Sequence, residues 1–342
     1  MEMSESRAVV CYRLPGAQQP VRWEMSADEV ETLHSMQRLN GRSGFVFAPF
    51  REEGEWPLLL FPEEKGEEKA DLSGSWPIYD HPHPSANSGM WPFDTFSEAL
   101  KRGGYDKLVL SRCEKYDMER HPDVRQLFEQ AMSCYPDAFV AMVSAPQCGT
   151  WLMATPEVLL QRNDTHYLTI ALAGTKPSAD ESMPWSKKDQ REQGYVTTYL
   201  SHVIERIARE KNIHGPYTVK AGTICHLRTD LLFSLADDNH LGTILQRLHP
   251  TPAVCGVPKR RAFHFILREE GYDRRYYSGF VGRIGPAPHP TSLFVTLRCI
   301  EIAHDSVWCY AGGGLLKESQ CEREWQETVE KMKTMKLLLM KQ

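Results

Sequence analysis

The feature that most limits the fold is an alternation of strand and helix patterns that runs from Phe96 to the end of this 342-residue chain. Short apolar runs typical of strands are separated by stretches with the periodicity of amphipathic helices, and no linker interrupts them. Residues 96–342 are therefore expected to fold together. Residues 1–95 are more irregular, with short strand candidates between charged or Pro- and Gly-rich connectors. One large domain or two merged lobes both fit this length.

Individual elements follow from the same patterns. The sequence predicts strands over residues 43–48, 57–61, 108–110, 139–144, 150–154, 291–302 and 307–310. It predicts helices over residues 123–135, 188–211 and 320–342, the last of them opened by a capping box of Ser319 and Glu322. His81 and His83 lie in a proline-rich stretch without a third metal ligand nearby, so a surface loop is expected there.

Composition excludes several classes of protein. Apolar residues are 41% and charged residues 25% of the chain, which is an ordinary soluble mixture. A net charge of -5 provides no general basic field for nucleic acid or an acidic membrane surface, and no apolar run approaches the roughly 18 residues of a membrane span. Nine scattered cysteines without a CxxC pair indicate a reducing compartment. We expect a cytoplasmic protein that binds neither nucleic acid nor membrane.

Acidic residues on two predicted helices are the first chemical signal. Glu324, Glu327 and Lys331 are spaced to share one helix face, and Gly312-Gly313-Gly314 lies just upstream, where bare backbone can approach an anion. Taken alone, this pattern is also typical of a solvated helix face after a turn. A second helix repeats it, with Asp189 and Glu192 one turn apart. Oxygen ligands delivered by two helices suit Mg²⁺.

Several ordered motifs resemble those of chorismate-utilising enzymes. They comprise residues 154–160 (ATPEVLL), 172–175 (LAGT), 248–254 (LHPTPAV), 273–279 (DRRYYSG), 297–299 (LRC), the glycine run 312–314 and residues 324–328 (EWQET). The resemblance covers about residues 96–335, and agreement of the whole series is far more specific than any one motif. It implies a single large α/β (α+β) domain with an extensive β-sheet core and outer helices. Residues 1–95 would be the N-terminal part of that fold and residues 96–342 the chorismate-binding catalytic core.

The resemblance also implies a set of site residues. Mg²⁺ would be bound by Glu192 and Glu327, with Glu324 and Asp189 close enough to contribute, and the metal would hold the ring carboxylate of chorismate. Residues implied to bind the substrate are Ala173, Gly174, Thr175, Tyr277, Arg298, Gly312, Gly313, Gly314 and Lys331. Arg298 and Lys331, with the glycine backbone, would bind the enolpyruvyl carboxylate, which charge-assisted donors suit well. Arg298 is expected inside an apolar strand.

The choice of nucleophile depends on a few positions. Lys107 stands where water-using relatives have Lys and ammonia-using relatives usually have Gln, and Ala173 stands where aminodeoxychorismate synthases commonly have a nucleophilic Lys. The resemblance thus implies an isochorismate synthase, an isomerase in which Lys107 is the general base toward water at C2. Glu157 would be the general acid for the departing C4 hydroxyl, and His249 would help to position that hydroxyl.

Departures and alternatives remain open at this point. Gln193 replaces a usual His, Arg275 replaces a usual Gly, and residues 257–261 differ from the frequent loop sequence. A salicylate synthase would begin with the same water chemistry, an enzyme like anthranilate synthase component I would use ammonia, and a non-catalytic relative would only bind chorismate. We expect a monomer, and the motifs do not separate menaquinone from siderophore biosynthesis.

Overall fold

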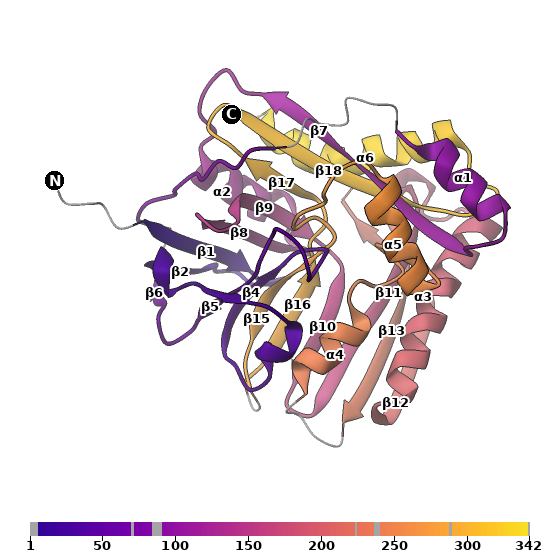
Figure 1. Cartoon of the computed structure of the whole chain (residues 1–342), viewed down its shortest axis with the longest axis horizontal. Coiled ribbons are helices and arrows are strands. Elements are labelled where there is room, and N and C mark those ends of the chain that lie inside the picture. The colour runs from indigo at the N-terminus through magenta and orange to yellow at the C-terminus, as the bar shows by residue number, and fades with distance from the viewer. Residues whose placement is uncertain are drawn as a thin grey trace.

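Two large antiparallel sheets form the centre of the molecule (Figure 1). The computed structural model describes residues 6–69, 72–83, 91–222, 224–235, 240–286 and 289–340. Each sheet has nine strands, and every pairing between the described strands is antiparallel. The sequence-based expectation of one large domain with a β-sheet core is confirmed, and its class is α+β.

Sheet A combines the first strands of the chain with strands from its middle and its end. Its order is β14 (Gly256–Val257), β7 (Lys107–Asp117), β18 (Ser306–Leu315), β17 (Cys299–Ile302), β9 (Gly149–Thr155), β8 (Phe139–Ala145), β1 (Arg7–Arg13), β2 (Val21–Ser26) and β6 (Glu67–Lys69). The long pairing of β7 with β18 sets Gly313 opposite Leu110 and Gly314 opposite Val109. The glycine run is therefore part of a strand and not of a turn.

Sheet B has the same mixed origin. Its order is β12 (Ala208–Ala221), β13 (Ile224–Leu235), β11 (His166–Pro177), β10 (Val158–Asn163), β16 (Thr291–Val295), β15 (Phe280–Ile284), β4 (Gly44–Ala48), β5 (Leu58–Pro62) and β3 (Glu31–Leu33). Strands from residues 1–95 enter both sheets, so this part of the chain is built into the same fold.

Aromatic side chains fill the space between the sheets. Phe139 of β8 stacks on Phe294 of β16 at 4.2 Å between ring centroids, and Tyr12 of β1 lies 5.2 Å from Phe45 of β4. These contacts join sheet A to sheet B through a buried apolar cluster. Such face-to-face packing buries one side of each strand and leaves the other side for the helices.

Helices cover the outer sides of the two sheets. Sheet A is covered by α2 (Val124–Cys134) and α6 (Cys321–Leu339), and sheet B by α3 (Lys187–Glu205) and α4 (Leu241–Leu248). At one edge of sheet A, α1 (Phe93–Lys101) and α5 (Lys259–Glu269) pack against β7. Figure 1 shows α6 running along β18 and α3 running beside β11. None of the helices among the described residues is both long and apolar enough to cross a bilayer.

Three sequence-based expectations of local structure were wrong. The helix predicted over residues 188–211 ends at Glu205, and residues 208–221 form β12, because pairing with β13 offers this segment a full ladder. The strand predicted over residues 291–302 is two strands, with β16 in sheet B and β17 in sheet A. The capping box is absent, since Gln320 is the N-cap of α6 and Ser319 Oγ accepts a hydrogen bond from the Leu316 amide.

Candidate active site

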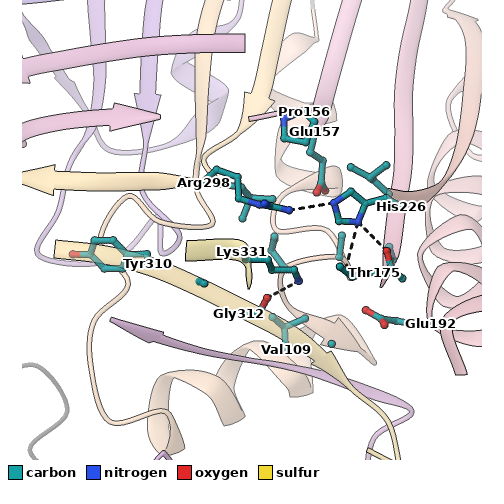
Figure 2. A pocket seen from close by; sticks show the side chains of 18 of the residues that line it. Val109, Pro156, Glu157, Thr175, Glu192, His226, Arg298, Tyr310, Gly312 and Lys331 are labelled. Carbon is teal, nitrogen blue, oxygen red and sulfur yellow. Dashed lines mark hydrogen bonds between the residues drawn. The ribbon is translucent and has the colours of Figure 1, made fainter. Parts of the chain in front are cut away.

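One cavity lies where the edge strands of sheet A approach β11 and β13 of sheet B (Figure 2). Its walls come from β7, β11, β13 and β18, from α3 and α6, and from the connections before β10, before β15 and between β16 and β17. Ten of the residues that the family resemblance singled out line it: Glu157, Ala173, Gly174, Thr175, Glu192, Tyr277, Arg298, Gly312, Gly314 and Lys331. Residues from seven separate parts of the chain thus meet in one place.

Arg298 reaches the cavity from the crossing between the sheets. Its backbone adopts φ 45°, a left-handed conformation at the point where the chain leaves β16 of sheet B and joins β17 of sheet A. The expectation that Arg298 lies within a continuous strand was therefore wrong. Burial lowers the pKa of Arg298 to about 10, so the guanidinium remains charged near neutral pH and needs an anion.

His226 of β13 positions this arginine, and the sequence motifs did not reveal it. Arg298 Nη2 lies 3.2 Å from His226 Nε2, and His226 Nδ1 lies 2.8 Å from the Gly174 carbonyl oxygen. Because a guanidinium only donates, Nε2 must accept and Nδ1 must carry the proton that it donates to Gly174. Burial and the charges of Arg298 and Lys331 lower the pKa of His226 to about 3. A neutral histidine therefore aims Arg298, and a histidine within an apolar strand was its only signal.

Glu157 has a carboxyl group whose pKa lies close to neutral pH. It follows Pro156 in the connection between β9 and β10, and its carboxyl group points into the cavity (Figure 2). Burial raises its pKa to about 7, although Lys107, Lys331 and Arg298 act in the opposite direction. A carboxyl group with this pKa can be protonated at neutral pH and can donate that proton.

Lys331 of α6 spans two acceptors. Its ammonium lies 2.7 Å from Glu327 Oε1 and donates to the Gly312 carbonyl oxygen at 2.8 Å. Burial alone would raise the pKa of Glu327, but Lys331 and Lys188 lower it to about 2, so the carboxylate is ionised. An ammonium at the cavity wall and a permanently charged carboxylate behind it are therefore fixed together.

Lys107 begins β7 and lies behind the cavity wall. Its side chain is fully buried, and its Nζ lies 3.1 Å from Glu192 Oε1 without a well-aligned hydrogen bond to any described residue. The two side chains meet beside Gly314, where an added Cβ would lie 2.0 Å from Glu192 Oε1 and 2.7 Å from Lys107 Cε. Only glycine at this position leaves room for the pair.

The other predicted metal ligands, Glu324, Glu327 and Asp189, lie near the Lys107–Glu192 pair and form one acidic corner of the site with it. Glu324 Oε1 lies 2.7 Å from Lys188 Nζ, and neither Glu324 oxygen accepts a well-formed hydrogen bond from the described residues. Burial raises the pKa of Asp189, whose carboxylate accepts from Ser186 Oγ. Gly313, which the resemblance also implies, is not in the cavity wall but faces α6, where an added Cβ would lie 3.5 Å from Glu327 Oε1 and 3.6 Å from Glu324 Oε2.

This corner has the donor chemistry of a hard-cation site. The atoms that could bind a cation here are all carboxylate oxygens, and the buried oxygens of Glu324 are short of hydrogen-bond partners, which would suit Mg²⁺. Among the residues that the structure describes, no three acidic, His or Cys side chains yet surround a single point. Glu192, Glu324 and Glu327 each face a lysine instead, so a cation would have to draw them together.

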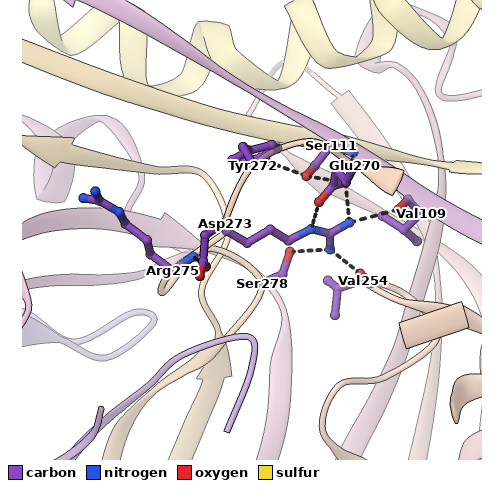
Figure 3. Close-up of polar contacts among 9 residues, drawn as sticks. Val109, Ser111, Val254, Glu270, Tyr272, Asp273, Arg275 and Ser278 are labelled. Carbon is purple, nitrogen blue, oxygen red and sulfur yellow. Dashed lines mark hydrogen bonds and ion pairs between the residues drawn. The ribbon is translucent and has the colours of Figure 1, made fainter. Parts of the chain in front are cut away.

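A buried ion pair between Arg274 and Glu270 supports the parts of the cavity wall that contain Val109 and Val254. Arg274 donates to both oxygens of Glu270 at 2.5 and 2.6 Å and to the carbonyl oxygens of Val254 at 2.7 Å and Val109 at 2.9 Å. Figure 3 shows Glu270, Val109 and Val254 around this contact, with Ser111 donating to the same carboxylate. Because Val109 and Val254 line the cavity, the pair holds two of its walls at a fixed separation.

His249 does not belong to the cavity, contrary to the role that the resemblance implied. Its imidazole lies 3.2 Å from the Phe50 carbonyl oxygen and lines a separate depression with Lys259 and Phe263. Burial lowers its pKa to about 3, so it is a neutral packing histidine. Ala253 and Val254 of the same motif do line the cavity, so the motif reaches it through these two small residues.

Known proteins resemble both the sequence and the fold. Residues 91–340 match the family described as chorismate binding enzyme. The vibriobactin-specific isochorismate synthase of Vibrio cholerae is 29% identical over 244 residues, which cover 68% of this chain and 61% of that protein. The isochorismate synthase MenF of Escherichia coli is 27% identical over 254 residues, which cover 71% of this chain and 58% of that protein.

A solved structure extends the likeness over the whole chain. The crystal structure of DhbC from Bacillus anthracis superposes with a TM-score of 0.81 at 23% identity. The superposition covers 97% of this chain and 96% of that one. The fold is therefore shared over nearly the full length, whereas the sequence alignments span about three fifths of the curated relatives.

Proposed function

Because the chain belongs to the family of chorismate binding enzymes, we propose that it is an isochorismate synthase that depends on Mg²⁺. The observation that carries the proposal is Glu157, a carboxyl group with a pKa near 7 that points into a cavity whose wall also contains the cationic side chains of Arg298 and Lys331. A dianionic substrate fits that charge, and a neutral acid fits the departure of a hydroxyl group. The aligned relatives named above are isochorismate synthases.

The two carboxylates of the substrate would bind to different groups in the site. Arg298, aimed by His226, and Lys331 with the Gly312 carbonyl oxygen behind it form a cationic wall for the enolpyruvyl carboxylate. Glu192, Glu324, Glu327 and Asp189 are the residues that would hold Mg²⁺, which would supply positive charge for the ring carboxylate. The two carboxylates would thus fix the ring between Glu157 and the Lys107–Glu192 pair.

The chain's own groups then move two protons. Lys107 first loses its ammonium proton to solvent, and the neutral amine then takes a proton from water as the water oxygen bonds to C2 of the ring. The ring double bonds shift toward C4, the C4–O bond breaks, and Glu157 gives its proton to the departing hydroxyl, which leaves as water. The proton on Lys107 and the missing proton on Glu157 are restored through solvent, so the substrate and product have the same composition.

Products of the purified protein with chorismate and Mg²⁺, resolved by chromatography, test the proposal. Isochorismate is expected, and it should disappear with Lys107→Met. Salicylate together with pyruvate would show that the reaction continues by elimination, and anthranilate formed with ammonia would place the chain in the other branch. Absence of turnover with metal present, while chorismate still binds, would show a non-catalytic relative.

A further inference from the structure

Lys188 has an unusual position for a lysine. It lies in the first turn of α3, where the helix dipole disfavours a cation, and its side chain is only 10% exposed. Its neighbour Lys187 is exposed to solvent on the same turn. The position of the Lys188 ammonium is explained by Glu324 of α6, whose Oε1 lies 2.7 Å away.

Glu324 depends on this contact. Its side chain is 1% exposed, and its oxygens accept no well-formed hydrogen bond from the part of the chain that the structure describes. A buried carboxylate without such bonds needs a cation close by. Lys188 is also near Glu192 and Glu327, the two other carboxylates of the corner.

The three lysines of the corner differ in what they can reach. Lys331 lines the cavity, and Lys107 lies beside Glu192, which lines it. Lys188 is not part of the cavity wall, so it has no contact with a ligand bound there. Whatever Lys188 contributes must pass through the carboxylates.

We propose that Lys188 is a built-in counter-ion that competes with a divalent cation for Glu324. Without metal, its ammonium neutralises the buried carboxylate and keeps α3 and α6 together. When Mg²⁺ binds to Glu324, the ammonium of Lys188 must move away from that carboxylate, because two cations bound to the same carboxylate repel each other strongly inside the protein. The inference rests on the proposed Mg²⁺ site, and it adds that metal affinity is set partly by a lysine that does not touch the substrate.

Titration of the metal-free protein with Mg²⁺ alone by calorimetry gives the first test. Lys188→Met keeps most of the buried stem and removes the charge, and it should lower the dissociation constant for Mg²⁺ by about ten-fold or more. Lys187→Met is the matched control, because it removes the same charge one residue away from an exposed position, and it should match wild type. Equal or weaker binding by Lys188→Met, or no binding by any of the three proteins, would overturn the inference.

Amine acetylation of the wild-type protein gives a second test that does not depend on a variant folding. Lys188 should react slowly without metal and faster at saturating Mg²⁺, with peptide mass spectrometry as the readout, whereas Lys187 should not change. Equal labelling of Lys188 with and without Mg²⁺ contradicts the exchange. The chorismate product assay is separate, so a protein that shows the exchange but makes no isochorismate would refute the proposed function and leave this inference standing.

Discussion

Replacement of Glu157 by Gln tests the assignment of the acid through both stability and rate. The side chain is 4% exposed, and burial raises its pKa from 4.5 to about 7 in spite of three cationic neighbours. Gln has nearly the same shape and cannot ionise. At high pH the variant therefore avoids the free-energy cost of burying a charged carboxylate. At every pH it lacks the proton that Glu157 would donate.

The size of the stability effect follows from the pKa. A change of one in pKa corresponds to about 1.4 kcal/mol, so a rise from 4.5 to about 7 is worth roughly 3 kcal/mol. Because the pKa of Glu157 is higher in the folded protein than in the unfolded chain, the protonated side chain stabilises the fold by this amount below pH 4.5. That stabilisation is lost as the pH rises through 7. Relative to Glu157→Gln, the wild-type protein should lose roughly 3 kcal/mol of unfolding free energy over this range and little beyond it.

Urea unfolding of both proteins at several pH values between 4.5 and 9 measures that difference. In the product assay, wild-type kcat/KM should fall as the pH rises above about 7, because the acid is then ionised, and the variant should lose roughly 100- to 10,000-fold in kcat. A stability difference that is independent of pH would refute the buried titration. A variant that keeps more than about a tenth of wild-type activity would refute the role as acid.

Three further changes test the groups opposite Glu157. Lys107→Met should lower kcat roughly 100- to 10,000-fold while chorismate binding measured by calorimetry persists, and wild-type turnover would exclude Lys107 as the base. Glu327→Gln should raise the Mg²⁺ concentration for half-maximal activity at least about ten-fold, and an unchanged titration would remove Glu327 from the metal ligands. Gly314→Ala places a Cβ 2.0 Å from Glu192 Oε1, so kcat/KM should fall roughly 100-fold with an unchanged circular dichroism spectrum. Wild-type kinetics of this variant would show that the Lys107–Glu192 pair tolerates displacement.

Much of the cavity wall could be predicted because the motifs carry single residues whose identity is itself the signal. Arg298 and Lys331 were expected as anion-binding groups and do line the cavity. Their partners could not be predicted, since a hydrogen bond such as that from Arg298 to His226 joins positions 72 residues apart. Pairing of Lys188 with Glu324 depends on how two helices approach each other, and helical periodicity gives only the face of each helix.

Strand patterns likewise gave the elements but not their sheets. An apolar run through residues 291–302 has no signal for a change of sheet, because both halves are equally apolar and the change occurs in the left-handed backbone of Arg298. The loop expected at His83 is present, but this side chain does not lie on the surface. The side chain of His83 is buried, stacked at 3.6 Å on Trp308 and 2.7 Å from the Tyr310 hydroxyl, and such contacts follow from packing alone.

The departures from the family pattern are accommodated outside the cavity. Arg275 has φ 52°, a conformation that costs a non-glycine residue about 1–2 kcal/mol, yet its guanidinium is buried 2.5 Å from Glu301 Oε1 and lies over the ring of Trp56. Glu301 in turn accepts from the hydroxyl of Tyr310, whose side chain borders the cavity. Figure 3 shows the side chain of Arg275 extending away from Glu270, Val109 and Val254. Gln193 donates to Thr229 and Thr197 and does not reach the cavity either. Both replacements therefore lie outside the cavity wall, among the residues that support it.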